Sequence, residues 1–236
     1  MDVAALLGDP AAFQARYQPI VDVATHRVVA HEALLHCTAP GVTPGALFAA
    51  ASANGQLARL DSLAREVAIR DAAGWLGDQL LFVKLAVHAG DLPADWLAST
   101  QDVAAVAGVP LRQVVLEVVQ PPSSEPLERT ARMVVRCRGA GFGVALVGAT
   151  NPRVVRHLVA ALLPDYLTLD RSVVSGLPGQ DAVAAAQAIL AEADPARVIA
   201  FGVENDTHAA SVLRLGVPWA QGWWYGRPRT PTVDNG

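Results

Sequence analysis

The segment QPIVDVATHRVVAHEALL, residues 18–35, contains two runs of β-type residues, 18–23 and 26–35, joined by a short polar turn. This pattern predicts a β-hairpin. After the hairpin, short apolar runs alternate with stretches in which apolar residues recur with a helical period. A hairpin followed by alternating strands and helices predicts a mostly parallel sheet whose strands are linked by helices.

The remaining elements follow in a regular order. Strands are expected at 80–87, 113–119, 142–148, 165–170, 197–204 and 217–226, and helices at 43–55, 56–76, 123–141, 152–162, 179–194 and 205–216. The first of these helices has Thr43 as its expected N-cap, with Pro44 at the first helical position. About eight strands in one chain favour a closed α/β barrel of the TIM (β/α)8 type over an open sheet.

Composition narrows the classes of function. The net charge is −4, and no run of five basic residues occurs, so nucleic acid is not expected as a main partner. No uncharged apolar run reaches the roughly 18 residues that a membrane span needs, and the first residues lack the pattern of a signal peptide. Cys37 and Cys137 show no CxxC spacing and are expected to be free thiols of a cytoplasmic protein.

In such a barrel the C-terminal ends of the strands line the functional site. Those ends hold Glu32, Lys84, Glu117, Val147, Thr168, Asp170, Phe201, Glu204 and Gln221. Lys84 is the only lysine in the chain. Periodicity alone assigns no chemistry to these residues.

Seven motifs in order along the chain resemble those of the bacterial EAL domain. They are YQPIVD with HEALL (17–22 and 31–35), FVKLAV (82–87), LEVVQ (116–120), GVALVGAT (143–150), PDYLTLD (164–170), VIAFGVEN (198–205) and AQGWWYGRP (220–228). The resemblance implies a modified TIM (β/α)8 barrel with an antiparallel first strand, over residues 1–228. Residues 229–236 are polar and are expected to form a loose C-terminal tail.

Active EAL domains hydrolyse cyclic-di-GMP with Mg²⁺ or Mn²⁺, and the resemblance implies which positions would hold the metals. Of these ligand positions, Glu32 and Glu117 keep their carboxylates. Lys84 replaces an asparagine, and Val147 and Gly148 replace two aspartates. Three further positions also differ. Thr168 replaces a lysine of the family, and Phe201 and Gln120 each replace a glutamate. An ammonium has no lone pair for a cation, so we expect the metal site, and with it catalysis, to be lost.

Lys84 suggests what replaces the metal. Without a cation, Glu32 and Glu117 would face each other as like charges, which is costly in a buried site. We therefore predict that the Lys84 ammonium bridges the two carboxylates. The alternative is a solvated lysine at the rim of the barrel.

The resemblance also implies a set of residues that would contact cyclic-di-GMP. These are Gln18, Glu32, Leu34, His36, Lys84, Glu204, Gln221 and Pro228. His36 stands where the family has an arginine, and a neutral histidine offers one donor where an arginine grips phosphate with two. The cluster of Trp223, Trp224 and Tyr225 would stack a guanine, pack against the barrel or form a protein interface.

Two functions remain open from the sequence. The first is a catalytically inactive signalling protein that still binds cyclic-di-GMP as a receptor. The alternative is a protein–protein interaction module that no longer binds it. Residual hydrolysis with a single metal is disfavoured, because rate accelerations of about 10⁶-fold or more rest on a complete site. A protein partner is expected, and homodimers are common among similar domains.

Overall fold

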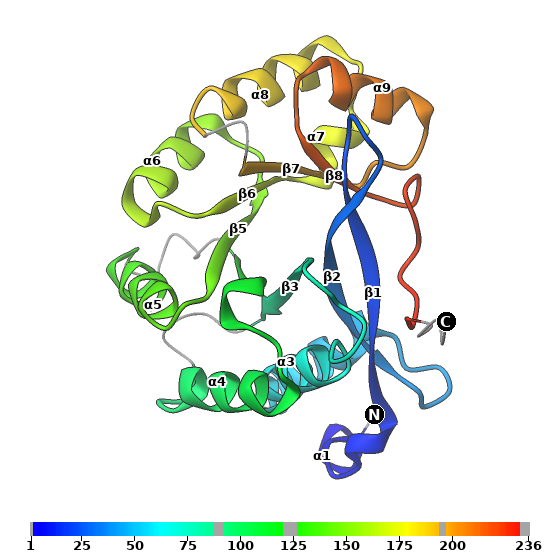
Figure 1. Ribbon diagram of the computed structural model, residues 1–236, viewed down its shortest axis with the longest axis vertical. Coiled ribbons are helices and arrows are strands. Elements are labelled where there is room, and N and C mark those ends of the chain that lie inside the picture. The colour runs from blue at the N-terminus through cyan, green and yellow to red at the C-terminus, as the bar shows by residue number, and fades with distance from the viewer. Residues whose placement is uncertain (1, 87–91, 120–126, 194–196, 232–236) are drawn as a thin grey trace.

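The computed structural model describes residues 2–86, 92–119, 127–193 and 197–231, and its eight strands form a closed barrel in the order β1 to β8 (Figure 1). The strands are β1 (Phe13–Asp22), β2 (Val28–Cys37), β3 (Leu80–Leu85), β4 (Val114–Val119), β5 (Gly143–Ala149), β6 (Tyr166–Leu169), β7 (Val198–Phe201) and β8 (Trp219–Gln221). Strand β1 is antiparallel to both of its neighbours, β2 and β8, and all other neighbouring pairs are parallel. The predicted hairpin and the predicted barrel with an antiparallel first strand are confirmed.

Helices surround the barrel. They are α1 (Val3–Leu7), α2 (Pro44–Ala53), α3 (Leu57–Arg70), α4 (Trp96–Ala107), α5 (Leu127–Gly139), α6 (Pro152–Leu162), α7 (Arg171–Ser175), α8 (Gln180–Leu190) and α9 (Asp206–Arg214), with short 3-10 helices η1 (Pro10–Ala12) and η2 (Leu111–Gln113). Thr43 caps α2 as predicted, because its side chain accepts a hydrogen bond from the backbone N–H of Ala46.

Some helix boundaries differ from the expectation. The helix expected over 56–76 ends at Arg70, and a turn with Gly74 at a φ of +82° follows it. The sequence did not predict helix α4. Its many alanines and valines leave it without a clear polar face, so it lacks the pattern of an amphipathic helix. The start of the helix expected from residue 123 lies outside the described residues.

Alternation along the strands divides the apolar side chains into two cores. The larger one fills the space between the strands and the helices. A small inner core within the barrel consists of Ile20, Ala30, Phe82, Val115, Ala145 and Ile199, with Tyr166 and Trp219 packed against it. Because side chains alternate with a period of two, the residues two positions further along point to the same side of the strands. The side chains two positions from the inner core therefore also point into the barrel, where they form the candidate site.

Tyr17 and Arg229 exchange backbone hydrogen bonds of 2.8 and 3.1 Å, so Arg229, the first residue of the expected tail, is paired with β1. Residues 232–236 of that tail lie outside the described residues. In the described ranges, no helix combines the length and the apolar character that crossing a membrane would require.

Candidate functional site in the barrel

One ring of side chains lies directly next to the inner core, toward the C-terminal ends of the parallel strands. Counting two residues from the inner core along each strand, its members are Gln18, Glu32, Lys84, Glu117, Val147, Thr168, Phe201 and Gln221. Most of the residues that were predicted to line the site therefore belong to this ring. Asp170 and Glu204 follow just after β6 and β7, respectively.

Glu32 is the centre of the polar contacts in this ring. The Lys84 Nζ donates to Glu32 Oε1 at 3.1 Å, and the Gln221 Nε2 donates to Glu32 Oε2 at 2.7 Å. Glu32 itself is buried, while 43% of the Lys84 side chain is exposed. The Glu32 carboxylate raises the pKa of Lys84 to about 12, against the opposing effect of burial and with a smaller contribution from Glu117. Both carboxylate oxygens of Glu32 are thus occupied by donors of this chain.

Glu117 lies in the same ring without such partners. Its side chain is fully buried, and neither carboxyl oxygen has a hydrogen-bond partner in the described part of the chain. Burial raises its pKa to about 8, the Glu32 charge adds to this rise, and Lys84 opposes it. Glu117 is therefore mostly protonated at neutral pH. The predicted bridge is half right: Lys84 contacts Glu32, but no hydrogen bond joins it to Glu117.

The other residues predicted to contact a ligand are spread over the same end of the barrel. Gln18 is nearly buried, and its Nε2 donates to the Gly226 carbonyl at 3.0 Å. Glu204 is exposed and forms an ion pair of 2.5 Å with Arg171. Leu34 lines a cavity of about 280 Å³ together with Lys84. Pro228 is partly buried near the C-terminal end of the described chain.

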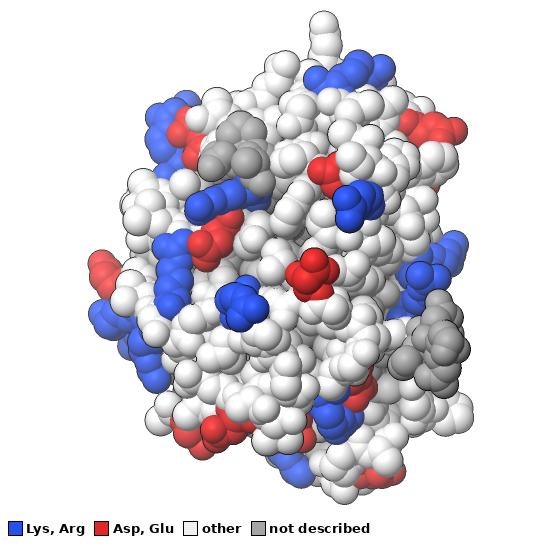
Figure 2. Space-filling model, in the orientation of Figure 1, with Lys and Arg blue, Asp and Glu red and all other residues white. Residues whose placement is uncertain are grey.

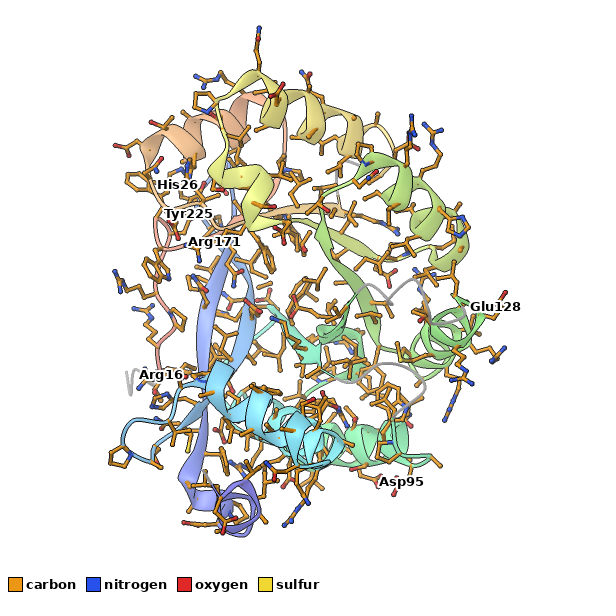
Figure 3. The ribbon with its side chains drawn as sticks, turned by 180° about the vertical axis from the view of Figure 1, so that it is seen from behind. Arg16, His26, Asp95, Glu128, Arg171 and Tyr225 are labelled. Carbon is orange, nitrogen blue, oxygen red and sulfur yellow. The ribbon has the colours of Figure 1, made fainter. Side chains whose placement is uncertain are left out.

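Arg16 is a candidate that the sequence analysis missed. Its Nη2 donates to the His36 Nε2 at 2.9 Å across the β1–β2 pair. Figure 3 labels Arg16 on β1 and Arg171 at the start of α7. Burial and the Arg16 charge lower the pKa of His36, so this histidine is neutral and accepts the hydrogen bond. A guanidinium therefore stands beside the position where the family has its arginine.

The signal that identifies Arg16 was available in the sequence. It lies two residues before Gln18 on the same strand, so the two side chains share one face. Only the register of the hairpin, which the sequence did not fix, places it next to His36.

Residues 7–228 match the EAL domain. The chain belongs to the EAL domain family. The uncharacterized protein Rv1357c of Mycobacterium tuberculosis is 25% identical over 226 residues, covering 89% of this chain and 73% of that protein. A structure titled PaMucR phosphodiesterase, c-di-GMP complex, has a TM-score of 0.83 at 22% identity and covers 97% of this chain and 96% of that one. The manganese and cyclic-di-GMP complex of Klebsiella pneumoniae BlrP1 has a TM-score of 0.81 at 23% identity, covering 95% and 62%.

The ring side chains of this EAL domain offer few free oxygen ligands for divalent cations. Such cations need several oxygen ligands that converge on one point, and Mg²⁺ demands near-octahedral geometry. Glu32 has both oxygens engaged by side chains of this chain, and the ammonium of Lys84 repels a cation. Among the described residues, no three histidine, cysteine, aspartate or glutamate side chains are grouped so that they could hold a metal.

The β5 end of the site differs from the metal-ligand pattern that the resemblance implied. Val147 offers no oxygen, and Gly148 has a φ of +86° in a local shift of the β5–β6 register. The Gly148 N–H donates to the Thr168 Oγ1 at 3.0 Å, so this hydroxyl is held by the backbone. Gln120, another position where the family has a glutamate, lies outside the described residues.

The three aromatic residues after β8 do not form one stacking surface in this EAL domain. Trp223 and Trp224 are 51% and 45% exposed. The Arg227 guanidinium lies over the Trp223 ring at 4.3 Å, and Tyr225 meets His26 edge-on at 5.9 Å between ring centroids. Two exposed tryptophans remain at the surface.

Proposed function

We propose that this EAL domain binds cyclic-di-GMP without hydrolysing it and acts as a receptor in signalling. The observation that carries the proposal is the Lys84–Glu32 hydrogen bond, which puts an ammonium among the former metal ligands. A cation held by the protein itself stabilises the Glu32 carboxylate where a relative would use a divalent ion. Cyclic-di-GMP is the ligand named for PaMucR and BlrP1, whose chains share this fold.

Hydrolysis lacks its means of activating water. A phosphodiester is attacked by a water that a metal or a general base has deprotonated. Glu32 already accepts from Lys84 and Gln221, and Glu117 is buried and protonated at neutral pH. Neither carboxyl group is therefore a free base, and a bound cyclic dinucleotide stays intact.

The groups that would bind cyclic-di-GMP differ from those that would hydrolyse it. A cyclic dinucleotide presents two negatively charged phosphodiesters, which suit guanidinium donors. A guanidinium has five N–H donors, and the side chain of Arg16 uses one of them for His36. Arg16 therefore takes the part of the missing family arginine in this proposal, with Gln18 on the same strand and Leu34 on the adjoining β2. Lys84 contributes positive charge although it is paired.

Titration calorimetry with cyclic-di-GMP, in EDTA and again with Mg²⁺, tests the proposal. We expect the same micromolar Kd in both buffers and no linear dinucleotide pGpG on chromatography after long incubation. Arg16→Ala should weaken binding about tenfold or more, as loss of a charge-assisted contact does. Arg132→Ala, an exposed position on α5, should leave it unchanged. Formation of pGpG at a Mg²⁺-dependent rate would refute the proposal.

The exposed tryptophans favour a second candidate function. Large aromatic residues at a surface are typical anchors of protein–protein interfaces. Trp223 and Trp224 directly follow β8, whose Gln221 contacts Glu32. A flat titration with a folded protein would favour an interaction module, and Trp223→Ser with Trp224→Ser should then abolish capture of its protein partner.

A further inference from the structure

A second cavity opens at the other end of the barrel. Its volume is about 500 Å³, and it is lined at the N-terminal ends of β4, β5, β6 and β8. None of its described lining residues belongs to the Glu32 ring. Its charged and half-buried aromatic side chains are Arg112, Arg138, Arg197, Asp165, Tyr166 and Trp219. Figure 2 shows basic side chains gathered around an acidic one where β5 and β6 lie.

One acidic residue organises the charges of this cavity. Asp165 accepts from Arg138 at 2.8 and 3.3 Å and from the Val144 N–H at 2.9 Å. Arg197 lies 3.9 Å from the same carboxylate. Asp165 thus holds the Arg138 guanidinium in place and neutralises one positive charge. It is the only acidic residue among the described residues that line the cavity.

Arg112 supplies a guanidinium that Asp165 does not hold in place. It lies on η2, just before β4, and it is exposed. Within the described residues its side chain has no ion pair or hydrogen bond. Three guanidinium groups around one carboxylate leave the cavity positive in a chain whose net charge is −4. Such a concave positive site attracts an anion, and arginines suit the oxygens of a phosphate.

Two aromatic rings form the apolar part of the same cavity. Tyr166 and Trp219 stack with their ring centroids 5.5 Å apart and an angle of 21° between the planes. Phe82 supports Tyr166 edge-on at 5.2 Å from within the barrel. Tyr166 and Trp219 are both half-buried, so part of each ring faces the cavity. Packing against the inner core fixes these rings, which makes them a rigid surface for a flat group.

We propose that this cavity binds a small phosphorylated ligand with a planar ring, of the nucleoside monophosphate class, at a site separate from the Glu32 ring. The phosphate contacts Arg112 and the free donors of Arg138, and the base lies on Tyr166 and Trp219. The volume is within the range of about 300–1,000 Å³ typical of small-molecule sites. The site depends on neither the presence nor the loss of a metal at the opposite end.

Titration calorimetry in EDTA with GMP, guanosine and ribose 5-phosphate tests this site. We expect GMP to bind, and guanosine and ribose 5-phosphate to bind at least tenfold more weakly, since each lacks one half of the ligand. Ribose 5-phosphate binding as tightly as GMP would overturn the role of the rings. Absence of GMP binding would overturn the proposal as a whole.

Variants place the binding at one end of the barrel. Arg112→Ala should weaken GMP binding about tenfold or more, and Arg112→Lys should fall between it and the unchanged protein. Arg136→Ala, which is exposed on α5 and outside the cavity, is the matched control and should change nothing. Arg16→Ala should also leave GMP binding intact. Loss of GMP binding in Arg16→Ala, with retention in Arg112→Ala, would assign it to the Glu32 end and refute the second site.

Discussion

The Nζ of Lys84 lies 3.1 Å from Oε1 of Glu32, on the side of the barrel where strand ends carry the family's metal ligands. The only lysine of the chain thus meets the most connected carboxylate of the ring. Gln221 holds the other oxygen of that carboxylate at 2.7 Å. Both oxygens of the Glu32 carboxylate are therefore held by side chains of this chain.

A double-mutant cycle measures this pair. Lys84→Met and Glu32→Gln, alone and together, should give a coupling energy of about 0.2–1 kcal/mol in urea unfolding, because 43% of the lysine side chain is exposed and water screens it. The single Lys84→Met variant should be the less stable of the two singles, since it leaves Glu32 without its countercharge. A coupling energy indistinguishable from zero would mean that the contact does not contribute to folding.

Glu117 predicts a pH dependence of stability. Its pKa is raised to about 8 in the folded chain from a model-compound value of 4.5. The folded state therefore holds the proton more tightly, so this contribution is complete below about pH 4.5 and is lost as the pH rises through 8. The slope cannot exceed about 1.4 kcal/mol per pH unit for one proton.

Urea unfolding at pH 5, 7 and 9 checks this dependence. The unchanged protein should lose stability between pH 5 and pH 9, and Glu117→Gln should lose clearly less, because the amide does not ionise. Glu66→Gln makes the same change at an exposed position on α3 and should follow the unchanged protein. Parallel curves for Glu117→Gln and the unchanged protein would show that Glu117 does not titrate in this range.

The sequence predicted the barrel architecture better than it predicted the contacts between side chains. The hairpin and the strand–helix alternation follow from local periodicity and favoured the barrel, whereas its antiparallel first strand was implied by the resemblance to the EAL domain. Strand β8 was expected over 217–226 but ends at Gln221. A Cβ at Gly222 would lie 1.9 Å from the Val203 carbonyl oxygen, so a close backbone approach, which periodicity does not encode, ends the strand.

The candidate site, like the fold, was predicted only in part. Its residue types and the place of Lys84 followed from the motifs, but the partners did not. The Arg16–His36 and Gln221–Glu32 contacts join residues 20 and 189 positions apart in sequence, and both depend on the strand register. The missing contact from Lys84 to Glu117 depends on the rotamer of a long side chain, which no sequence pattern specifies.

A buried ion pair holds the segment beyond Lys84. Asp61 and Arg65 are almost fully buried on α3 and pair with each other, and Asp61 Oδ1 accepts from the Ala86 N–H at 2.6 Å. Arg65→Met should lower the free energy of unfolding by about 3–5 kcal/mol, because it leaves a buried carboxylate without its partner. Adding Asp61→Asn should recover part of the loss. Chemical denaturation measures both variants, and an unchanged midpoint for Arg65→Met would contradict the expected cost.

Introducing metal ligands tests the proposal that Lys84 excludes a divalent cation from the ring. Lys84→Asn with Val147→Asp removes the ammonium and adds a carboxylate and an amide oxygen to the ring, while Gly148 stays unchanged because its φ of +86° disfavours a side chain. This double variant should bind Mn²⁺ at least tenfold more tightly than the unchanged protein in calorimetry. Lys84→Met removes the charge without adding a ligand and should gain much less. Stoichiometric, tight Mn²⁺ binding by the unchanged protein would show that the ammonium does not exclude the cation.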